Sequence, residues 1–176
     1  IDGGSNPNWD FGDQPPQIYE LHPANDTVIE LGHVQEFNLT IVNATYPIDY
    51  VGLWMNVSGV WQEVNYTTTA INGTVSLAYT LDTLGAYTWG GVVNDTQSYS
   101  NVTPSNWTFT VADTTGPTLS GISHNPSLQG YGLNVTVDAT ATDLSGIPSV
   151  TLGVTFEGSE ANHSMVSAGG DDYTYN

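Results

Sequence analysis

Apolar and polar side chains alternate in short runs along much of this chain, and turn residues separate the runs. Between Val34 and Val42 the apolar residues Phe37, Leu39 and Ile41 occupy every second position. Successive side chains of a strand point to opposite faces, so this pattern predicts a strand with one buried face. Similar runs cover residues 17–21, 28–31, 50–57, 60–64, 74–81, 86–93 and 106–112. No window has helical periodicity, so the chain is predicted to be all-β.

The segment 81–93 combines a turn with a strand. The turn contains Gly85, and Tyr87, Trp89 and Gly91 share one face of the strand that follows. An immunoglobulin-type sandwich has such a corner between its strands E and F, where a tyrosine ring packs inward and its hydroxyl group caps upstream backbone. We therefore expect Tyr87 to be buried and hydrogen-bonded to the turn.

Trp54 lies upstream of this corner, about where strand C of such a sandwich should run. With this tryptophan and the corner, the sequence resembles the immunoglobulin-like and fibronectin-III-like modules of prokaryotic, particularly archaeal, surface glycoproteins. The resemblance covers roughly residues 16–112. It implies a two-sheet sandwich for that segment and says almost nothing about function, because one fold hosts many functions.

The segment Asp113–Pro117 predicts a boundary, after which alternation resumes in 118–122, 133–137 and 150–156. We predict tandem immunoglobulin-like β-sandwiches, arranged as an extended arm (1–16), a first sandwich (17–112), a linker (113–117) and a second module (118–176). The second module is expected to lack its last strand or strands at Asn176. Continuation of the polypeptide is the favoured explanation, and a strand added by a neighbouring subunit is the alternative.

The charge balance excludes several partners. The chain has no Lys, Arg or Cys and 18 acidic residues, for a formal net charge of -18. Without Lys or Arg the chain has no side chain to neutralise phosphates, which excludes direct binding to nucleic acid. The same lack argues against binding to anionic membrane surfaces. No stretch reaches the roughly 18 apolar residues of a membrane span. Self-assembly would need metal ions, salt or sugars to screen the repulsion between copies.

The strongest functional pattern is the sequon Asn-X-Ser/Thr, the acceptor for N-linked glycosylation. Ser and Thr fill about a fifth of the positions, so chance would give about three sequons. The chain has eleven, at Asn25, Asn38, Asn43, Asn56, Asn65, Asn72, Asn94, Asn101, Asn106, Asn134 and Asn162. The alternative is a Thr- and Asn-rich β surface that matches by composition. We expect several sites to carry N-linked glycans, which indicates an extracellular, secreted or cell-surface protein.

Two carboxylates are candidate calcium ligands. Asp113 at the joint and Asp143 in the second module are expected to approach each other at one pole of that module. Calcium prefers oxygen ligands, and an ion there would stiffen the joint. The favoured alternative is that both are solvated turn carboxylates that cap local backbone.

Patterns for catalysis are missing from the sequence. The four histidines His22, His33, His124 and His163 are far apart and lack metal-ligand spacing. There is no nucleophile elbow or Gly-rich phosphate loop, and no Lys or Arg to stabilise an oxyanion. We expect no enzymatic activity.

The sequence therefore predicts a non-catalytic, heavily N-glycosylated subunit of an extracellular surface layer, sheath or filament. Such a subunit would form a homo-polymer or self-assembling lattice, with strand addition as one route. The alternative is an extracellular adhesin, or a carbohydrate-binding module of a larger secreted protein. In that case Trp61 with Tyr66, or Tyr99 with Trp107, would stack on sugar rings. A structural role predicts sugars on many faces, and a binding role predicts one sugar-free aromatic face.

Overall fold

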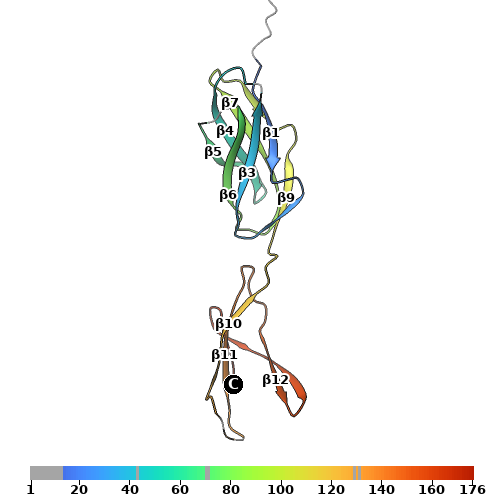
Figure 1. The fold of residues 1–176 in the computed structure, drawn as a ribbon, viewed down its shortest axis with the longest axis vertical. Coiled ribbons are helices and arrows are strands. Elements are labelled where there is room, and N and C mark those ends of the chain that lie inside the picture. The colour runs from blue at the N-terminus through green and yellow to red at the C-terminus, as the bar shows by residue number, and fades with distance from the viewer. Residues whose placement is uncertain (1–13, 43, 70–71, 129, 131) are drawn as a thin grey trace, which may run out of the picture. The chain divides into compact units, whose positions relative to one another are not determined.

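A computed structural model describes residues 14–42, 44–69, 72–128, 130 and 132–176. Most of the predicted arm at residues 1–16 lies outside these ranges. The described residues form fifteen strands and no helix. The chain divides into two compact units, Ile1–Ala112 and Asp113–Asn176, and each is described by itself (Figure 1).

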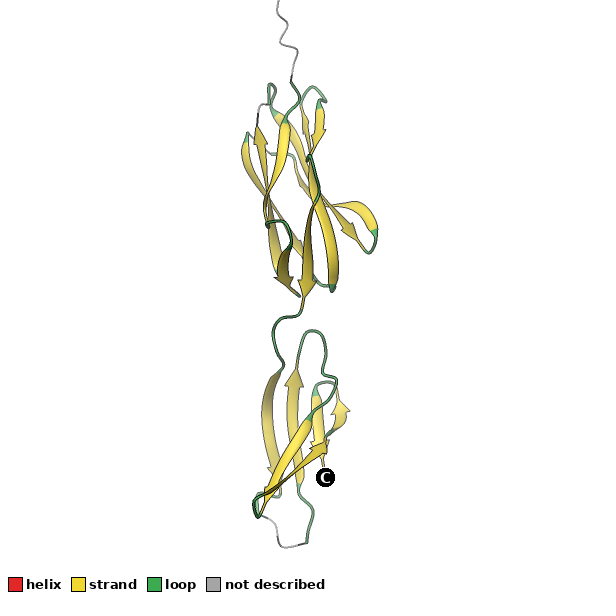
Figure 2. Ribbon diagram, turned by 90° about the vertical axis from the view of Figure 1, so that its right-hand side faces the viewer, coloured by secondary structure: helices red, strands yellow, loops and turns green. Residues whose placement is uncertain are grey.

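The first unit is a two-layer β-sandwich (Figure 2). Its described strands are β1 Gln17–His22, β2 Thr27–Glu30, β3 Val34–Val42, β4 Ile48–Val57, β5 Val60–Thr67, β6 Gly73–Thr80, β7 Gly85–Asp95, β8 Ser100–Val102 and β9 Trp107–Ala112. One sheet has the order β1-β3-β6 and the other β2-β9-β7-β4-β5, with β8 paired to β7. Only the β2–β9 pair is parallel among these described strands. This order is that of an immunoglobulin-like or fibronectin-III-like sandwich, with strands A, B and E facing G, F, C and C′.

The core of the first unit lies between the two sheets. Phe37, Leu39 and Ile41 are fully buried, as their alternation predicts. The Phe37 ring packs edge-on against Trp89, with centroids 5.0 Å apart and an interplanar angle of 68°. Trp89 thus fills the space where antibody domains place a disulfide. Gly91 follows on the same face, and a Cβ there would lie 2.9 Å from side-chain atoms of Ile18 and Leu39.

Strand bounds agree with the alternation where one face is buried. The predicted strand Val34–Val42 has the same bounds in β3, while the run at 60–64 extends to Thr67 in β5. The short strand β8 was not predicted. Its three residues Ser100–Val102 are exposed or half-buried, so burial imposes no pattern on them.

The second unit is also all-β. Its strands are β10 Thr118–Asn125, β11 Thr136–Thr142, β12 Thr151–Phe156, β13 Ser159–Ser164, β14 Val166–Gly169 and β15 Asp172–Tyr175. Four form a sheet in the order β10-β11-β15-β14, and β12 and β13 form a separate hairpin. Ala139 and Ala141 of β11 are its buried apolar residues among those described. Large apolar side chains such as Phe156 are exposed.

The prediction for residues 133–137 was wrong about where the strand begins. Strand β11 starts at Thr136 and runs to Thr142. The Leu133 amide closes a turn onto the Gly130 carbonyl at 3.3 Å, and the Leu133 side chain is 65% exposed. The alternation at residues 133–137 therefore arises partly in a loop and does not mark a buried face.

Candidate functional site

The sequon asparagines are distributed over strands and loops of both units. Among the described ones, Asn25, Asn72, Asn106, Asn134 and Asn162 are exposed, and Asn38, Asn56, Asn65, Asn94 and Asn101 are half-buried. None of these described asparagines is fully buried. Asn43 lies outside the described residues. The surface distribution is therefore compatible with sugars at several places.

Both sheets of the first unit carry sequons on their outer faces. Asn38 lies on β3 between the buried Phe37 and Leu39, so it faces away from the core. Asn56 on β4 and Asn94 on β7 likewise face away from the core, on the opposite sheet. In these three residues Oδ1 is buried and has no hydrogen-bond partner in the described part of the chain.

Hydrogen bonds involve other sequon asparagines in two ways. Asn72 and Asn101 use Oδ1, which accepts from the amides of Ala44 (3.3 Å) and Val102 (2.9 Å). Asn65 instead donates from Nδ2 to the Ala78 carbonyl at 2.9 Å. Since Nδ2 is the atom to which a sugar would be attached, Asn65 is the least suitable acceptor among these three in the folded protein.

Aromatic side chains gather on the outer face of the larger sheet. Strand register pairs Trp54 with Glu63 and Gly52 with Tyr66, which places Trp54 and Tyr66 on that face. Trp61 lies there too and is 42% exposed, while Tyr66 is 57% exposed. The predicted pair Trp61 and Tyr66 thus shares one face of β5.

Tyr50 joins this aromatic surface from β4. Its ring stacks on Tyr66, with centroids 5.9 Å apart and an interplanar angle of 23°, and it covers Gly52. Its hydroxyl group donates a hydrogen bond to the Glu63 carboxylate. Burial, followed by this hydrogen bond and the charge of Glu63, raises the pKa of Tyr50 to about 12. Tyr50 is therefore neutral at physiological pH.

A hollow of about 220 Å³ lies beside the two tryptophans. Its lining includes Trp54 and Trp61 on one side and Val102, Thr103 and Asn106 on the other. The floor is β7, where Trp54 pairs with Gly90. A Cβ at Gly90 would lie 2.6 Å from Thr103 Oγ1 and 2.7 Å from Asn106 Oδ1. Glycine at this position allows the segment 103–106 to lie against the outer face of the sheet.

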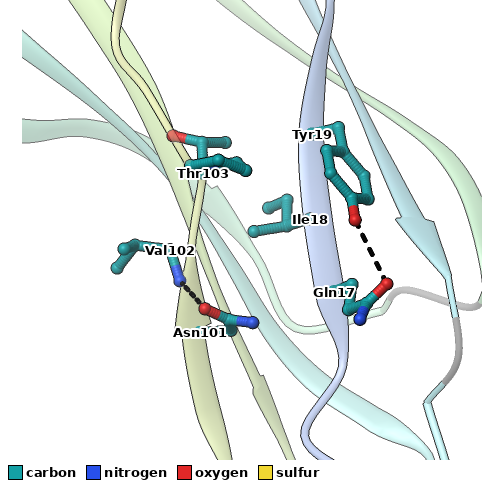
Figure 3. A pocket seen from close by; sticks show the side chains of 7 residues that line it. Gln17, Ile18, Tyr19, Asn101, Val102 and Thr103 are labelled. Carbon is teal, nitrogen blue, oxygen red and sulfur yellow. Dashed lines mark hydrogen bonds between the residues drawn. The ribbon is translucent and has the colours of Figure 1, made fainter.

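A second hollow, of about 300 Å³, lies between β1 on one side and β8 with the two residues after it on the other (Figure 3). Tyr19 and Gln17 form one wall, and the Tyr19 hydroxyl donates to Gln17 Oε1 at 3.1 Å. The Asn101 side chain points from β8 toward β1 in Figure 3. Thr103, the hydroxyl residue of its sequon, is 6% exposed and accepts a hydrogen bond from the Gly91 amide at 3.2 Å.

The structure gives Tyr99 and Trp107, the other predicted aromatic pair, different neighbours. Trp107 packs edge-on against the buried Trp89, with centroids 6.0 Å apart, and so extends the core. Tyr99 stacks on Tyr46 at 6.2 Å. The aromatic surface around Trp61 is therefore the better candidate for binding sugar.

Asp113 and Asp143 approach each other within the second unit. Asp113 Oδ2 and Asp143 Oδ1 both accept from the Ser145 amide at 3.0 Å. Asp113 Oδ1 also accepts from the Thr115 amide at 3.1 Å. A hydrogen bond from the Ser145 side chain is the main cause that lowers the pKa of Asp113. The two carboxylates therefore both accept hydrogen bonds from backbone amides.

The other titratable groups that the structure describes form no larger cluster. Among the described residues, no three His, Cys, Asp or Glu side chains are placed to hold a metal ion together. His163 contacts Tyr175, with its Nδ1 at 3.1 Å from the tyrosine hydroxyl. No helix in the described ranges is long and apolar enough to cross a membrane.

No family model and no curated protein matches this chain. Among solved structures, the chain is similar to fibronectin(III)-like modules of Clostridium thermocellum CbhA, at 20% sequence identity. That match covers 90% of this chain and 77% of the other chain, with a TM-score of 0.46. The immunoglobulin-like assignment of the first unit rests on its own strand order.

Proposed function

We propose that this chain is a non-catalytic, N-glycosylated structural part of an extracellular surface layer, sheath or filament. The observation that carries the proposal is the spread of sequons over both outer faces of the first unit. Asn38 lies on one sheet, and Asn56 and Asn94 lie on the other. A module that binds a ligand through one sheet face would need that face clear of sugars, whereas a coated spacer would not.

The charge limits how copies of this chain could assemble. With a net charge of -18 and no Lys or Arg, copies of this chain repel one another, and no ion pair with a basic side chain can offset that repulsion. Neutral glycans would add bulk and hydration between copies. The proposed homo-polymer or lattice would then form through backbone, apolar or sugar contacts, or with cations from the medium.

Mass spectrometry of the native protein tests this proposal directly. The absence of Lys and Arg gives trypsin no cleavage site, so peptides come from a protease with another specificity, such as one that cuts at Asp or Glu. We expect sugar on asparagines of both sheets, including Asn38 and Asn94, and a large loss of mass on deglycosylation. A protein without sugar at any sequon would refute the glycoprotein proposal. Electron microscopy of the native assembly would then test the lattice separately.

A second candidate function is carbohydrate binding, which the aromatic surface favours. Tyr50, Trp54, Trp61 and Tyr66 lie on one face, and two of them are more than a third exposed. Aromatic faces of this kind line many small-molecule sites. Calorimetric titration of the unglycosylated chain with soluble oligosaccharides distinguishes the two candidates. Binding that is lost in Trp61→Ala would favour the module over the spacer.

A further inference from the structure

We propose that the first sugar of an N-linked glycan on Asn106 docks in the hollow beside Trp54 and Trp61. This inference rests on the proposed glycosylation and names the place where one particular glycan would lie. It assigns the exposed Trp61 a partner within the same molecule. The occupant is one sugar ring that is covalently tethered to the wall of the hollow.

The register of the larger sheet places the attachment point beside the aromatic wall. Trp54 on β4 pairs with Gly90 on β7. Asn106 lies over Gly90, because its Oδ1 occupies the space that a Cβ there would need. Asn106 and both tryptophans line the same hollow. A sugar attached to Asn106 therefore begins next to the indole rings.

The orientation of the Asn106 amide suits attachment. From the position of a Cβ at Gly90, Asn106 Oδ1 lies at 2.7 Å and Cγ at 3.7 Å, so the oxygen points toward the strand. Nδ2 is the other substituent of Cγ and is not among these nearest atoms. Asn106 is also exposed. Attachment at Nδ2 therefore leaves the contact between Oδ1 and the sheet in place.

The size and chemistry of the hollow fit one ring. Its volume of about 220 Å³ is room for several water molecules, and it is below the roughly 300–1,000 Å³ of sites that enclose a free drug-sized ligand. Trp61 and Val102 provide apolar surface, and they are 42% and 57% exposed. One face of a sugar ring presents C–H groups, which pack on an indole, while its hydroxyl groups stay in water.

The covalent link explains why the attached sugar, and not a free one, is expected to occupy the hollow. A contact with a single ring is weak when both partners diffuse freely. A short covalent link makes the same contact intramolecular, at an effective concentration in the millimolar range. The hollow can thus be filled by the glycan on Asn106 although it would hold a free monosaccharide poorly.

The test uses the full chain, produced in a host that transfers N-linked sugars, and compares wild type with Trp61→Ala. The matched control is Tyr66→Ala, which removes an exposed aromatic from the same strand and face but outside the hollow. The readouts are occupancy at Asn106, proton chemical shifts of its first sugar, and the melting temperature before and after sugar removal. Substitution of Thr108 is avoided, since its backbone amide and its hydroxyl bond to Asn25.

If the glycan docks, the first sugar on Asn106 shows upfield shifts from the indole ring current. These shifts vanish in Trp61→Ala and persist in Tyr66→Ala. Sugar removal lowers the melting temperature of wild type by about 4 °C, and lowers that of Trp61→Ala by less.

Four results overturn the docking proposal. Occupied sequons elsewhere with an empty Asn106 refute it and leave the glycoprotein proposal standing. An occupied Asn106 without ring-current shifts does the same. A chain with no sugar at any sequon refutes both proposals. If the unglycosylated chain binds a free oligosaccharide tightly at Trp61, the hollow is a ligand site and the docking proposal is again wrong.

Discussion

The Tyr87 hydroxyl donates a hydrogen bond to the Thr83 carbonyl at 2.8 Å, across the corner between β6 and β7. The Tyr87 side chain is 7% exposed, and its ring stacks on Phe109 with centroids 5.1 Å apart and an interplanar angle of 4°. The burial of Tyr87 and its hydrogen bond to the turn were predicted from the segment 81–93, whereas the stacking on Phe109 was not. The bond fixes the turn to the strand that follows it.

The substitution Tyr87→Phe tests this corner. It keeps the ring against Phe109 and removes only the hydroxyl group, which leaves the Thr83 carbonyl without that donor. We expect the free energy of unfolding of the first unit to fall by about 1 kcal/mol, the net value of a typical hydrogen bond. Urea unfolding followed by tryptophan fluorescence measures it, since Trp89 lies in the same core. Tyr66→Phe, which alters an exposed tyrosine, serves as control, and equal effects in both variants would contradict the assignment.

The corner was predictable because each of its requirements is local in sequence. The bounds of β3 were predictable for a similar reason, since core and solvent alternate along it without interruption. The hollow at Asn106 was not predictable. It depends on Gly90 lacking a side chain and on the path of the segment 103–106, and neither leaves a periodic pattern. The bond between Thr108 and Asn25 joins residues 83 positions apart and requires the parallel pairing of β2 with β9.

Glu20 is a buried carboxylate that we expect to reduce stability at neutral pH. It is 8% exposed, and its Oε1 has no hydrogen-bond partner in the described part of the chain. Burial raises its pKa above the ordinary value of 4.5. The folded state therefore favours the protonated form. The contribution of Glu20 to the free energy of unfolding is therefore present below pH 4.5. It is lost as the pH rises through the pKa that Glu20 has in the folded state.

The substitution Glu20→Gln removes the charge and keeps the shape. At pH 7 we expect it to stabilise the first unit by about 1 kcal/mol, because an uncharged buried amide costs less than a buried carboxylate whose Oε1 lacks a partner among the described residues. The gain should shrink as the pH approaches 4, where wild-type Glu20 takes up its proton. Thermal unfolding at both pH values checks this. A gain that does not depend on pH would show that the charge is not the cause.

Tyr50 is expected to make the stability of the first unit depend on pH at the alkaline end of the range. Its pKa is raised to about 12, from an ordinary value of 10.0. The folded state favours the neutral phenol, so its contribution is intact below pH 10 and is lost as the pH rises toward 12. We expect the melting temperature to fall over this window, and to fall less in Tyr50→Phe. Near-ultraviolet absorbance of tyrosinate follows the titration itself, and identical pH profiles for both proteins would contradict the account.

For Asp113 and Asp143, we propose that calcium adds to the backbone capping that the structure contains. Two carboxylates around the Ser145 amide offer oxygen ligands at short range. If the ion binds, calcium at ten times its dissociation constant stabilises the second unit by about 1.4 kcal/mol, and chelator reverses the gain. Asp143→Asn should abolish the response, and Asp82→Asn in the first unit should not. A melting temperature insensitive to calcium in wild type would leave capping as their role.

Asn65 provides the sharpest test of whether glycosylation follows the folded surface. Its Nδ2 donates to the Ala78 carbonyl at 2.9 Å and its Oδ1 accepts from the Tyr66 amide at 2.8 Å, so both ends of the amide are engaged. Asn72 is exposed and uses only Oδ1 in the bond to Ala44. A sugar on Asn65 would compete for the nitrogen that bonds Ala78.

We therefore expect glycopeptides of the native protein to show sugar on Asn72 and little or none on Asn65. In parallel, Asn65→Ala should destabilise the first unit by about 1–2 kcal/mol, because the Ala78 carbonyl and the Tyr66 amide lose their partner. Asn72→Ala should cost less, since one bond to a described residue, of 3.3 Å, is lost. Full occupancy of Asn65 would mean that sugar is attached before β5 forms. The side-chain geometry of the folded chain would then not decide which sequons are used.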